Sequence, residues 1–124
     1  MSLGIEDTVA VLRMFDVDAT KRFYVDYLGF SVDWEDGGGD GPVYIQVSRD
    51  KLHLHLSSHH DDGTPGSVVL VMVRDVDALH AELRERRYPF LNPAVEPGPA
   101  GGREMQLIDP ASNRIRFYER APSS

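Results

Sequence analysis

The sequence predicts an α+β protein of two paired βαβββ modules that form a curved mixed sheet around a cleft. The length of 124 residues fits one domain and not two. A shift of 59 residues places Asp16 on Asp75, with apolar residues before and a helical pattern after each aspartate. Each half then continues with strand patterns. We therefore expect a single domain over residues 1–124, with modules at about 5–58 and 66–120.

In the first module, a strand is expected over residues 8–15, which are rich in β-branched and apolar side chains. The segment Asp16-Val-Asp18 follows, where a carboxylate can cap the free N–H groups of a helix over 19–27. Gly29 ends the helix, because glycine tolerates the left-handed conformation common at helix ends. The remaining expected elements are strands over 30–35, 43–47 and 51–57, with a mobile Gly-rich loop over 36–42.

Residues 51–57 alternate strictly between apolar and polar side chains, so the last strand of the first module has two distinct faces. Leu54 and Leu56 lie on one face, and His53 and His55 lie on the other. If the leucine face packs under the helices, the histidine face lines the concavity.

The second module repeats this order of elements. We expect a strand over 67–73, a helix over 76–87, an irregular Pro- and Gly-rich segment over 93–102, and strands over 104–108 and 114–119. Each module has about 55 residues and is too small to bury a complete core by itself. The modules must therefore pack on each other or on a second chain.

Composition narrows the class of protein. No apolar run approaches the roughly 20 residues that a membrane span requires, and the absence of cysteine excludes disulfides and thiol nucleophiles. The chain start has neither a basic nor an apolar stretch, so we expect a cytoplasmic protein. The net charge of −7 argues against nucleic acid and favours a cationic partner, although an acidic shell that only maintains solubility also explains it.

Several motifs carry a family resemblance over nearly the whole chain. The run from Ala10 to Phe30 contains Asp16-Val-Asp and ends in Tyr24-x-x-x-Leu-Gly-Phe, and the second half contains Gly102-Arg-Glu followed by Asp109-Pro and Asn113. These residues resemble the vicinal-oxygen-chelate superfamily of glyoxalases, ring-cleaving dioxygenases and antibiotic-resistance proteins, and within it the bleomycin-resistance proteins. The resemblance implies paired βαβββ modules, commonly completed by dimerisation, so a homodimer is expected.

Enzymes of this superfamily bind one divalent metal through His, Glu or Gln side chains, and the matching positions can be compared one by one. The position on the first strand holds Val9, and the position on the last strand holds Arg116. The equivalent positions at 66–68 contain no metal-ligating side chain, so His55 is the one remaining candidate ligand. A catalytic site normally has about three protein ligands. We therefore expect no metal, no other cofactor and no catalytic residue. Two alternatives are a metal held jointly by His53 and His55, and one in the His- and Asp-rich loop 59–62.

The sequence thus leads to two hypotheses. The first is non-catalytic binding and sequestration of a small cationic or aromatic molecule, as in antibiotic resistance; the alternative is a metal-dependent glyoxalase- or dioxygenase-type lyase or isomerase. Bleomycin-binding members carry a Trp before the Gly-Arg-Glu motif and aromatics on the strand before the second Asp turn. This chain has Gly101 in the first place, and Leu70 and Met72 in the second.

Strand alternation also predicts where a ligand lies. The expected cleft has the loops 36–42 and 93–102 at its rim. Because burying Arg114 and Arg116 on this face without partners is costly, we expect Glu104 or a neighbouring carboxylate to pair with one of them, unless the ligand brings an anion. Core packing is the alternative role for the aromatic residues. The six expected ligand-binding residues are Trp34, Tyr44, His53, His55, Glu104 and Arg116.

Overall fold

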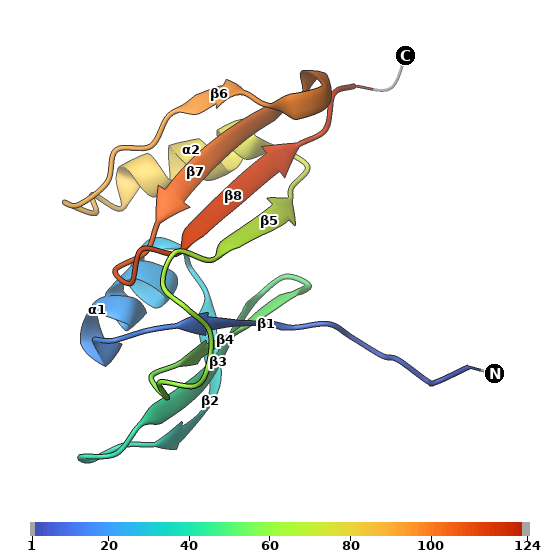
Figure 1. Cartoon of the computed structure of the whole chain (residues 1–124). Helices are drawn as coiled ribbons and strands as arrows, with labels where there is room; N and C mark the ends of the chain where they lie inside the picture. The colour runs from blue at the N-terminus through green and yellow to red at the C-terminus, as the bar shows by residue number, and fades with distance from the viewer. Residues whose placement is uncertain (1, 123–124) are drawn as a thin grey trace.

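The computed structural model describes residues 2–122, which form two four-stranded sheets, each with helices from its own half of the chain (Figure 1). The strand orders are β1-β4-β3-β2 and β5-β8-β7-β6. In each sheet the first and last strands of the module pair in parallel and the other pairs are antiparallel, so both sheets are mixed. The predicted α+β fold of two sheet modules is confirmed.

The elements of the first half are β1 (Ala10–Arg13), α1 (Val17–Lys21), the π-helix η1 (Arg22–Tyr27), β2 (Ser31–Gly37), β3 (Val43–Arg49) and β4 (Leu52–Ser57). Those of the second half are β5 (Val68–Met72), α2 (Val76–Glu85), β6 (Val95–Pro97), the 3-10 turn η2 (Pro99–Gly101), β7 (Arg103–Ile108) and β8 (Arg114–Glu119). No helix within residues 2–122 is long and apolar enough to cross a membrane.

The aspartates at the repeated position cap the two helices in the same way. Asp16 accepts a hydrogen bond from the Ala19 N–H, and Asp75 accepts one from the Ala78 N–H, each at 3.0 Å. The predicted cap is therefore confirmed, although the helix starts at Val17 and not at residue 19. A side-chain oxygen at this position satisfies an N–H group that has no partner within the helix.

The first helix changes its hydrogen-bond pattern after one turn. The Leu28 N–H donates to the Phe23 carbonyl five residues earlier, which is the pattern of a π-helix. This segment buries Phe23, Tyr24 and Tyr27. Gly29 follows with a φ of +74°, as predicted for the end of the helix.

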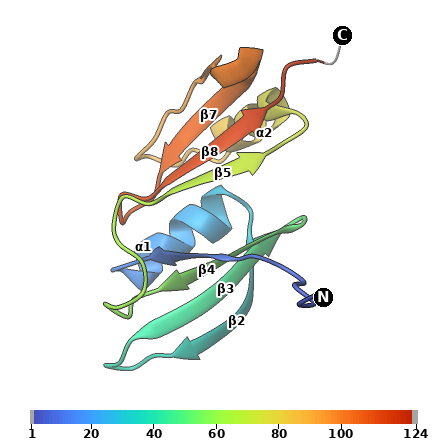
Figure 2. The same cartoon turned by 45° about the vertical axis from the view of Figure 1, so that its right-hand side comes forward.

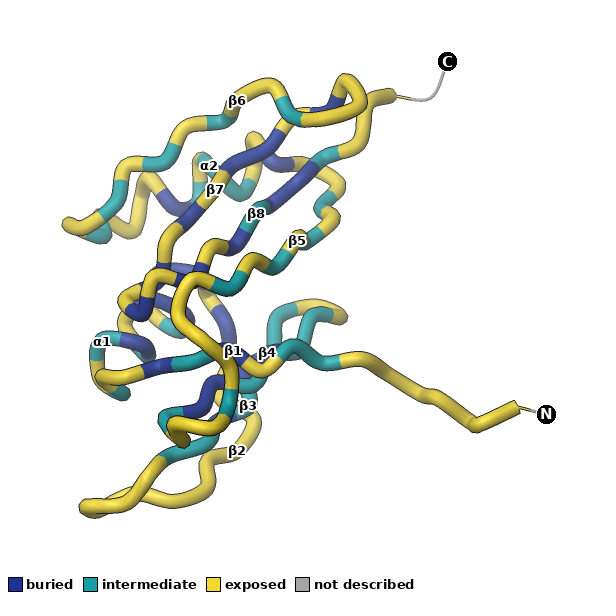
Figure 3. The backbone as a smooth tube through the Cα atoms, in the orientation of Figure 1, coloured by how far each residue is buried: buried dark blue, intermediate teal, exposed yellow. Residues whose placement is uncertain are grey.

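The α1–η1 helix lies between the two sheets, so one core serves both modules (Figure 2). Leu54 and Leu56 of the first sheet and Ile115 of the second are almost fully buried. Phe23 also contacts Tyr88 from the second half, with ring centroids 5.9 Å apart. Buried positions lie along β3, β4, β7 and β8, while β2 and the N-terminal segment are exposed (Figure 3). The prediction that the leucine face packs under the helices is confirmed.

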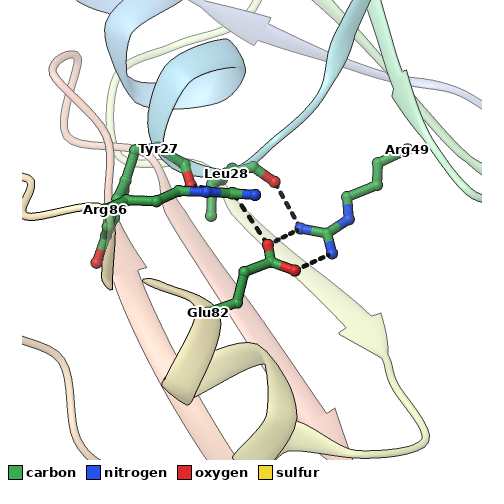
Figure 4. A network of polar contacts seen from close by, with 5 residues as sticks. All are labelled: Tyr27, Leu28, Arg49, Glu82 and Arg86. Carbon is green, nitrogen blue, oxygen red and sulfur yellow. Dashed lines mark hydrogen bonds and ion pairs between the residues drawn. The ribbon is translucent and has the colours of Figure 1, made fainter. Parts of the chain in front are cut away.

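A polar network joins the end of η1 to α2 (Figure 4). Arg49 donates to both carboxylate oxygens of Glu82, at 2.7 and 2.8 Å, and to the Leu28 carbonyl at 2.7 Å. Arg86 donates to the Tyr27 carbonyl at 2.7 Å and lies 2.9 Å from Glu82. The network therefore satisfies the exposed carbonyl end of the helix and links the two halves of the chain.

Two predictions about the loops are wrong. The segment 93–102 contains β6, which pairs with β7 at the edge of the second sheet. The sequence did not predict this strand because it contains Pro97, but proline is tolerated at a sheet edge where no neighbouring strand needs its N–H. Asp36 and Gly37, predicted as part of a loop, extend β2 opposite Tyr44 and Val43. Only the remainder of that segment forms the turn before β3.

Candidate functional site

The open face of the first sheet, on the side away from the core, carries an aromatic cluster of Trp34, Tyr44 and His55. The Trp34 and Tyr44 rings are stacked, with centroids 5.8 Å apart and an interplanar angle of 6°. His55 packs edge-on against both rings. Trp34 is 43% exposed. A large indole held open to solvent offers a flat surface on which another ring can stack.

A β-bulge explains how β2 contributes two neighbouring side chains to the same face. The register between β2 and β3 shifts between Val32 and Trp34, so one extra residue is inserted there. Asp33 and Trp34 consequently both reach the open face: Asp33 accepts hydrogen bonds from Gln46 and Ser48, each at 2.9 Å, and Trp34 stacks on Tyr44. The hydrogen bonds from Gln46 and Ser48 lower the pKa of the Asp33 carboxyl.

Both ring nitrogens of His55 lie at hydrogen-bond distance from neighbours on the sheet. Nδ1 is 2.6 Å from the Tyr44 hydroxyl and Nε2 is 2.9 Å from the Gln46 side-chain oxygen. Burial, and secondarily the charge of Asp62, raises the pKa of Tyr44. His53 lies on the same face, and its Nδ1 has no hydrogen-bond partner within the described residues. The first sheet thus brings four of the predicted site residues together.

The open face of the second sheet carries the other two. Arg116 donates from Nε and Nη2 to one Glu104 oxygen, at 3.2 and 2.7 Å. Gln106 donates to the other Glu104 oxygen at 3.1 Å. The hydrogen bond from Arg116 holds the pKa of Glu104 below its ordinary value. The predicted pairing of a carboxylate with one of the two arginines is confirmed: Glu104 pairs with Arg116, which is half-buried.

The strand registers make His55 and Arg116 equivalent positions. Val11 of β1 lies opposite His55, and Leu70 of β5 lies opposite Arg116. Because the repeat superimposes Val11 on Leu70, the two polar residues correspond to each other. Gln46 lies opposite His55, and Gln106 occupies the corresponding place opposite Arg116.

Within residues 2–122, no hydrogen bond, ion pair or aromatic contact joins the cluster on the first sheet to the Arg116–Glu104 pair on the second. The six predicted residues therefore form two groups on two sheets, and a single cleft built from all of them remains a prediction. Each group adjoins one of the predicted rim loops: Asp36 pairs with Tyr44, and Glu96 pairs with Glu104.

A groove of about 750 Å³ lies between the two halves of the chain. Leu28, Leu52 and Phe117 contribute apolar walls, and Arg49 and Glu82 contribute charges. None of the six predicted residues lines it. Sequence reasoning missed this groove because it exists only where the β3–β4 turn, β5 and α2 are brought together by the fold.

The side chains at the positions that hold metal in enzymes of the superfamily are here His55, Arg116 and Val9. His55 already has a hydrogen-bonding neighbour at each ring nitrogen, and Arg116 places a fixed positive charge on Glu104. Val9 offers no ligand atom. Among the residues that the structure describes, no three His, Asp or Glu side chains lie close enough together to hold a metal ion. The residues at these positions do not fit a divalent metal.

Comparison with known proteins places these features in a family. The model of the family described as glyoxalase superfamily protein matches residues 1–124. No curated protein sequence matches the chain. The bleomycin-binding protein of Streptomyces verticillus, solved with copper(II)-bleomycin, is 33% identical, with a TM-score of 0.70, over 98% of this chain and all (100%) of that chain.

Two further solved structures share the fold. An antibiotic-binding protein from Streptomyces sp. CB03234 is 24% identical over 97% of this chain and 100% of its own, with a TM-score of 0.72. A lactoylglutathione lyase from Agrobacterium tumefaciens has the same TM-score of 0.72 at 16% identity, over 95% of this chain and 96% of its own. With its two mixed sheets and a family match over its whole length, this chain belongs to the glyoxalase superfamily.

Proposed function

We propose that the protein binds and sequesters a small aromatic or cationic molecule without transforming it, in the manner of an antibiotic-resistance protein. The observation that carries this proposal is the exposed Trp34–Tyr44 stack beside a His55 whose two nitrogens are already engaged. The stack offers a surface for a flat ring, and the histidine is committed to neighbouring side chains. Such an arrangement favours binding over metal-assisted chemistry.

Charge supports the same class of ligand. The chain carries 20 acidic and 13 basic residues, a net charge of −7. Asp33 lies on the same face as the aromatic stack and is held ionised by its hydrogen bonds. A cationic ring is attracted both to the aromatic faces and to the surrounding negative potential.

The complete site in this proposal needs two chains. The strand edges of β1 and β5 have no partner strand within the described residues, and each sheet carries one of the two groups of site residues. Pairing of the first sheet of one chain with the second sheet of another would face the aromatic cluster towards an Arg116–Glu104 pair. The homodimer is therefore part of the proposal.

The molecules to test are chosen from the antibiotics, because two of the similar proteins are antibiotic-binding and bleomycin-binding proteins. Isothermal titration calorimetry with metal-free bleomycin, copper(II)-bleomycin and a panel of aromatic antibiotics and metabolites is expected to find at least one saturable ligand. Trp34→Ala should weaken that binding by at least about five-fold, since stacking on an aromatic ring contributes about 1–3 kcal/mol. Phe90→Ala is the matched control, because Phe90 is also an exposed ring (70%) but lies outside both sheets.

Two results would contradict the proposal. One is equal ligand affinity in Trp34→Ala and wild type. The other is lactoylglutathione lyase activity that appears when zinc, nickel or manganese is added and that is lost in His55→Ala, which would support the metal-dependent alternative.

A further inference from the structure

Four polar side chains from three neighbouring strands form a continuous chain across the open face of the first sheet. Asp33 of β2 accepts a hydrogen bond from the Gln46 amide of β3 at 2.9 Å. The Gln46 oxygen lies 2.9 Å from His55 Nε2 on β4, and His55 Nδ1 lies 2.6 Å from the Tyr44 hydroxyl on β3. We call this set the Asp33–Tyr44 relay. The function proposed above gives no role to Gln46.

The hydrogen-bonding capacity of each group gives the relay one direction. An ionised carboxylate only accepts, so Gln46 must present its NH₂ group to Asp33 and its oxygen to His55. That oxygen also only accepts, so His55 carries a proton on Nε2. In the neutral imidazole the other nitrogen, Nδ1, is then an acceptor, and the Tyr44 hydroxyl must donate to it.

The surroundings keep both ends of the relay in this state. The Ser48 hydroxyl donates to the second Asp33 oxygen at 2.9 Å. Together with the hydrogen bond from Gln46, this contact lowers the pKa of Asp33 and keeps its carboxyl ionised at neutral pH. At the other end, burial and the charge of Asp62 raise the pKa of Tyr44, so its hydroxyl keeps its proton.

We propose that Asp33 and Gln46 are positioning residues that turn the Tyr44 proton inward, so that the Tyr44 oxygen meets a ligand only as a hydrogen-bond acceptor. The inference rests on the proposed function and specifies its ligand: a flat ring that carries an N–H or O–H donor at its edge. A ring with only acceptor atoms there would face the Tyr44 lone pairs without a hydrogen bond, which is unfavourable when water is excluded.

The tautomer of His55 tests the relay without any ligand. Long-range ¹H–¹⁵N correlation spectra of histidine-labelled protein at pH 8 are expected to show His55 protonated at Nε2 and unprotonated at Nδ1. Gln46→Lys should reverse this pattern, because an ammonium group still pairs with Asp33 but can only donate to Nε2. A wild-type His55 protonated at Nδ1, or an unchanged pattern in Gln46→Lys, would overturn the proposal.

His80 serves as the internal control in the same spectra. Its Nε2 lies 3.0 Å from the Pro93 carbonyl, which only accepts, so His80 should be protonated at Nε2 in both proteins. A purely structural role for Gln46 would leave the His55 tautomer in place or broaden all histidine signals together. Reversal at His55 alone is therefore specific to the relay.

The ligand preference is tested with indole and 1-methylindole, two rings of similar shape that differ in the N–H donor. Indole should bind about five-fold more tightly, the factor expected for one net hydrogen bond. Tyr44→Phe should abolish the difference, whereas Tyr88→Phe, which removes a hydroxyl outside both sheets, should keep it. Equal binding of both probes to wild type would overturn the acceptor role of Tyr44 and leave the proposed function standing. Binding of neither probe would contradict the aromatic site on which both proposals depend.

Discussion

The Tyr24 hydroxyl donates a 2.6 Å hydrogen bond to the carboxylate of Asp109, which lies 85 residues further along the chain. Both side chains are buried. Asp109 also accepts from the backbone N–H groups of Ala111 and Asn113, and the Asn113 amide donates to the Arg13 carbonyl. This bond therefore connects the first helix to the β7–β8 turn, and it gives a physical role to the Asp-Pro and Asn positions of the family motif.

Tyr24→Phe should destabilise the fold by about 2 kcal/mol, because a hydrogen bond to a buried charged group is lost and one Asp109 oxygen loses its hydroxyl donor. The measurement is equilibrium unfolding in urea. Tyr88→Phe removes the same atom where no hydrogen bond is formed to it within the described residues, and it should change the free energy of unfolding by less than about 0.5 kcal/mol. Equal losses in both variants would contradict the role of the Asp109 contact.

Glu82→Gln should make stability less dependent on pH in the acid range. The hydrogen bond from Arg49, together with the nearby arginine charges, lowers the pKa of Glu82 in the folded protein. A carboxyl with a lowered folded-state pKa stabilises the protein above its unfolded-state pKa, and this stabilisation is lost as the pH falls through the folded value.

The difference in urea midpoint between wild type and Glu82→Gln should therefore be present at pH 7 and shrink below about pH 4. Because Glu82 is partly exposed, the effect at pH 7 should stay near 1 kcal/mol or below. Glu85→Gln removes an exposed carboxylate without an ion pair in the described structure and serves as the control. A pH-independent difference for Glu82→Gln would contradict the network in Figure 4.

Gly102→Ala should destabilise the second sheet by about 1–3 kcal/mol, the usual cost of overpacking. A Cβ atom at this position would lie 2.4 Å from the Tyr118 ring and 2.5 Å from the Glu119 carbonyl oxygen. Gly41→Ala is the control, since its nearest contact there would be an ordinary 3.5 Å. Thermal unfolding that shifts equally in both variants would show that the close approach to Tyr118 does not restrict Gly102.

Leu70→Lys should shift the proposed homodimer to a monomer. Val68, Leu70 and Met72 are 45%, 51% and 44% exposed on edge strand β5, and such an apolar edge is suited to an interface. Size-exclusion chromatography with light scattering should give twice the 13.9 kDa chain mass for wild type and for Phe90→Lys. A 13.9 kDa species alone at micromolar wild-type concentration would contradict the dimer.

The sequence was informative where a short pattern decides the structure. Alternation in β4 correctly placed Leu54 in the core and His55 on the opposite face. The cost of burying arginines correctly predicted that a carboxylate pairs with one of them, which in the structure is the Glu104–Arg116 pair. Both inferences depend on strand periodicity and local charge alone.

Features built from distant segments could not be predicted in this way. The Tyr24–Asp109 bond and the groove between the halves depend on how the modules pack. Gln46 is an intermediate case. It lies two residues after Tyr44 on β3, so the sequence could predict that both side chains share a face, but the contact of Gln46 with Asp33 requires the bulge in β2.

The most direct test of the account uses Trp34, the only tryptophan of the chain. Its fluorescence should change saturably when a ligand found by calorimetry is added, with a midpoint that matches the calorimetric affinity, because the proposed site places the ligand against the exposed indole. Unchanged emission at a ligand concentration that saturates the calorimetric signal would show that the ligand binds elsewhere, and would contradict the site on the open face of the first sheet.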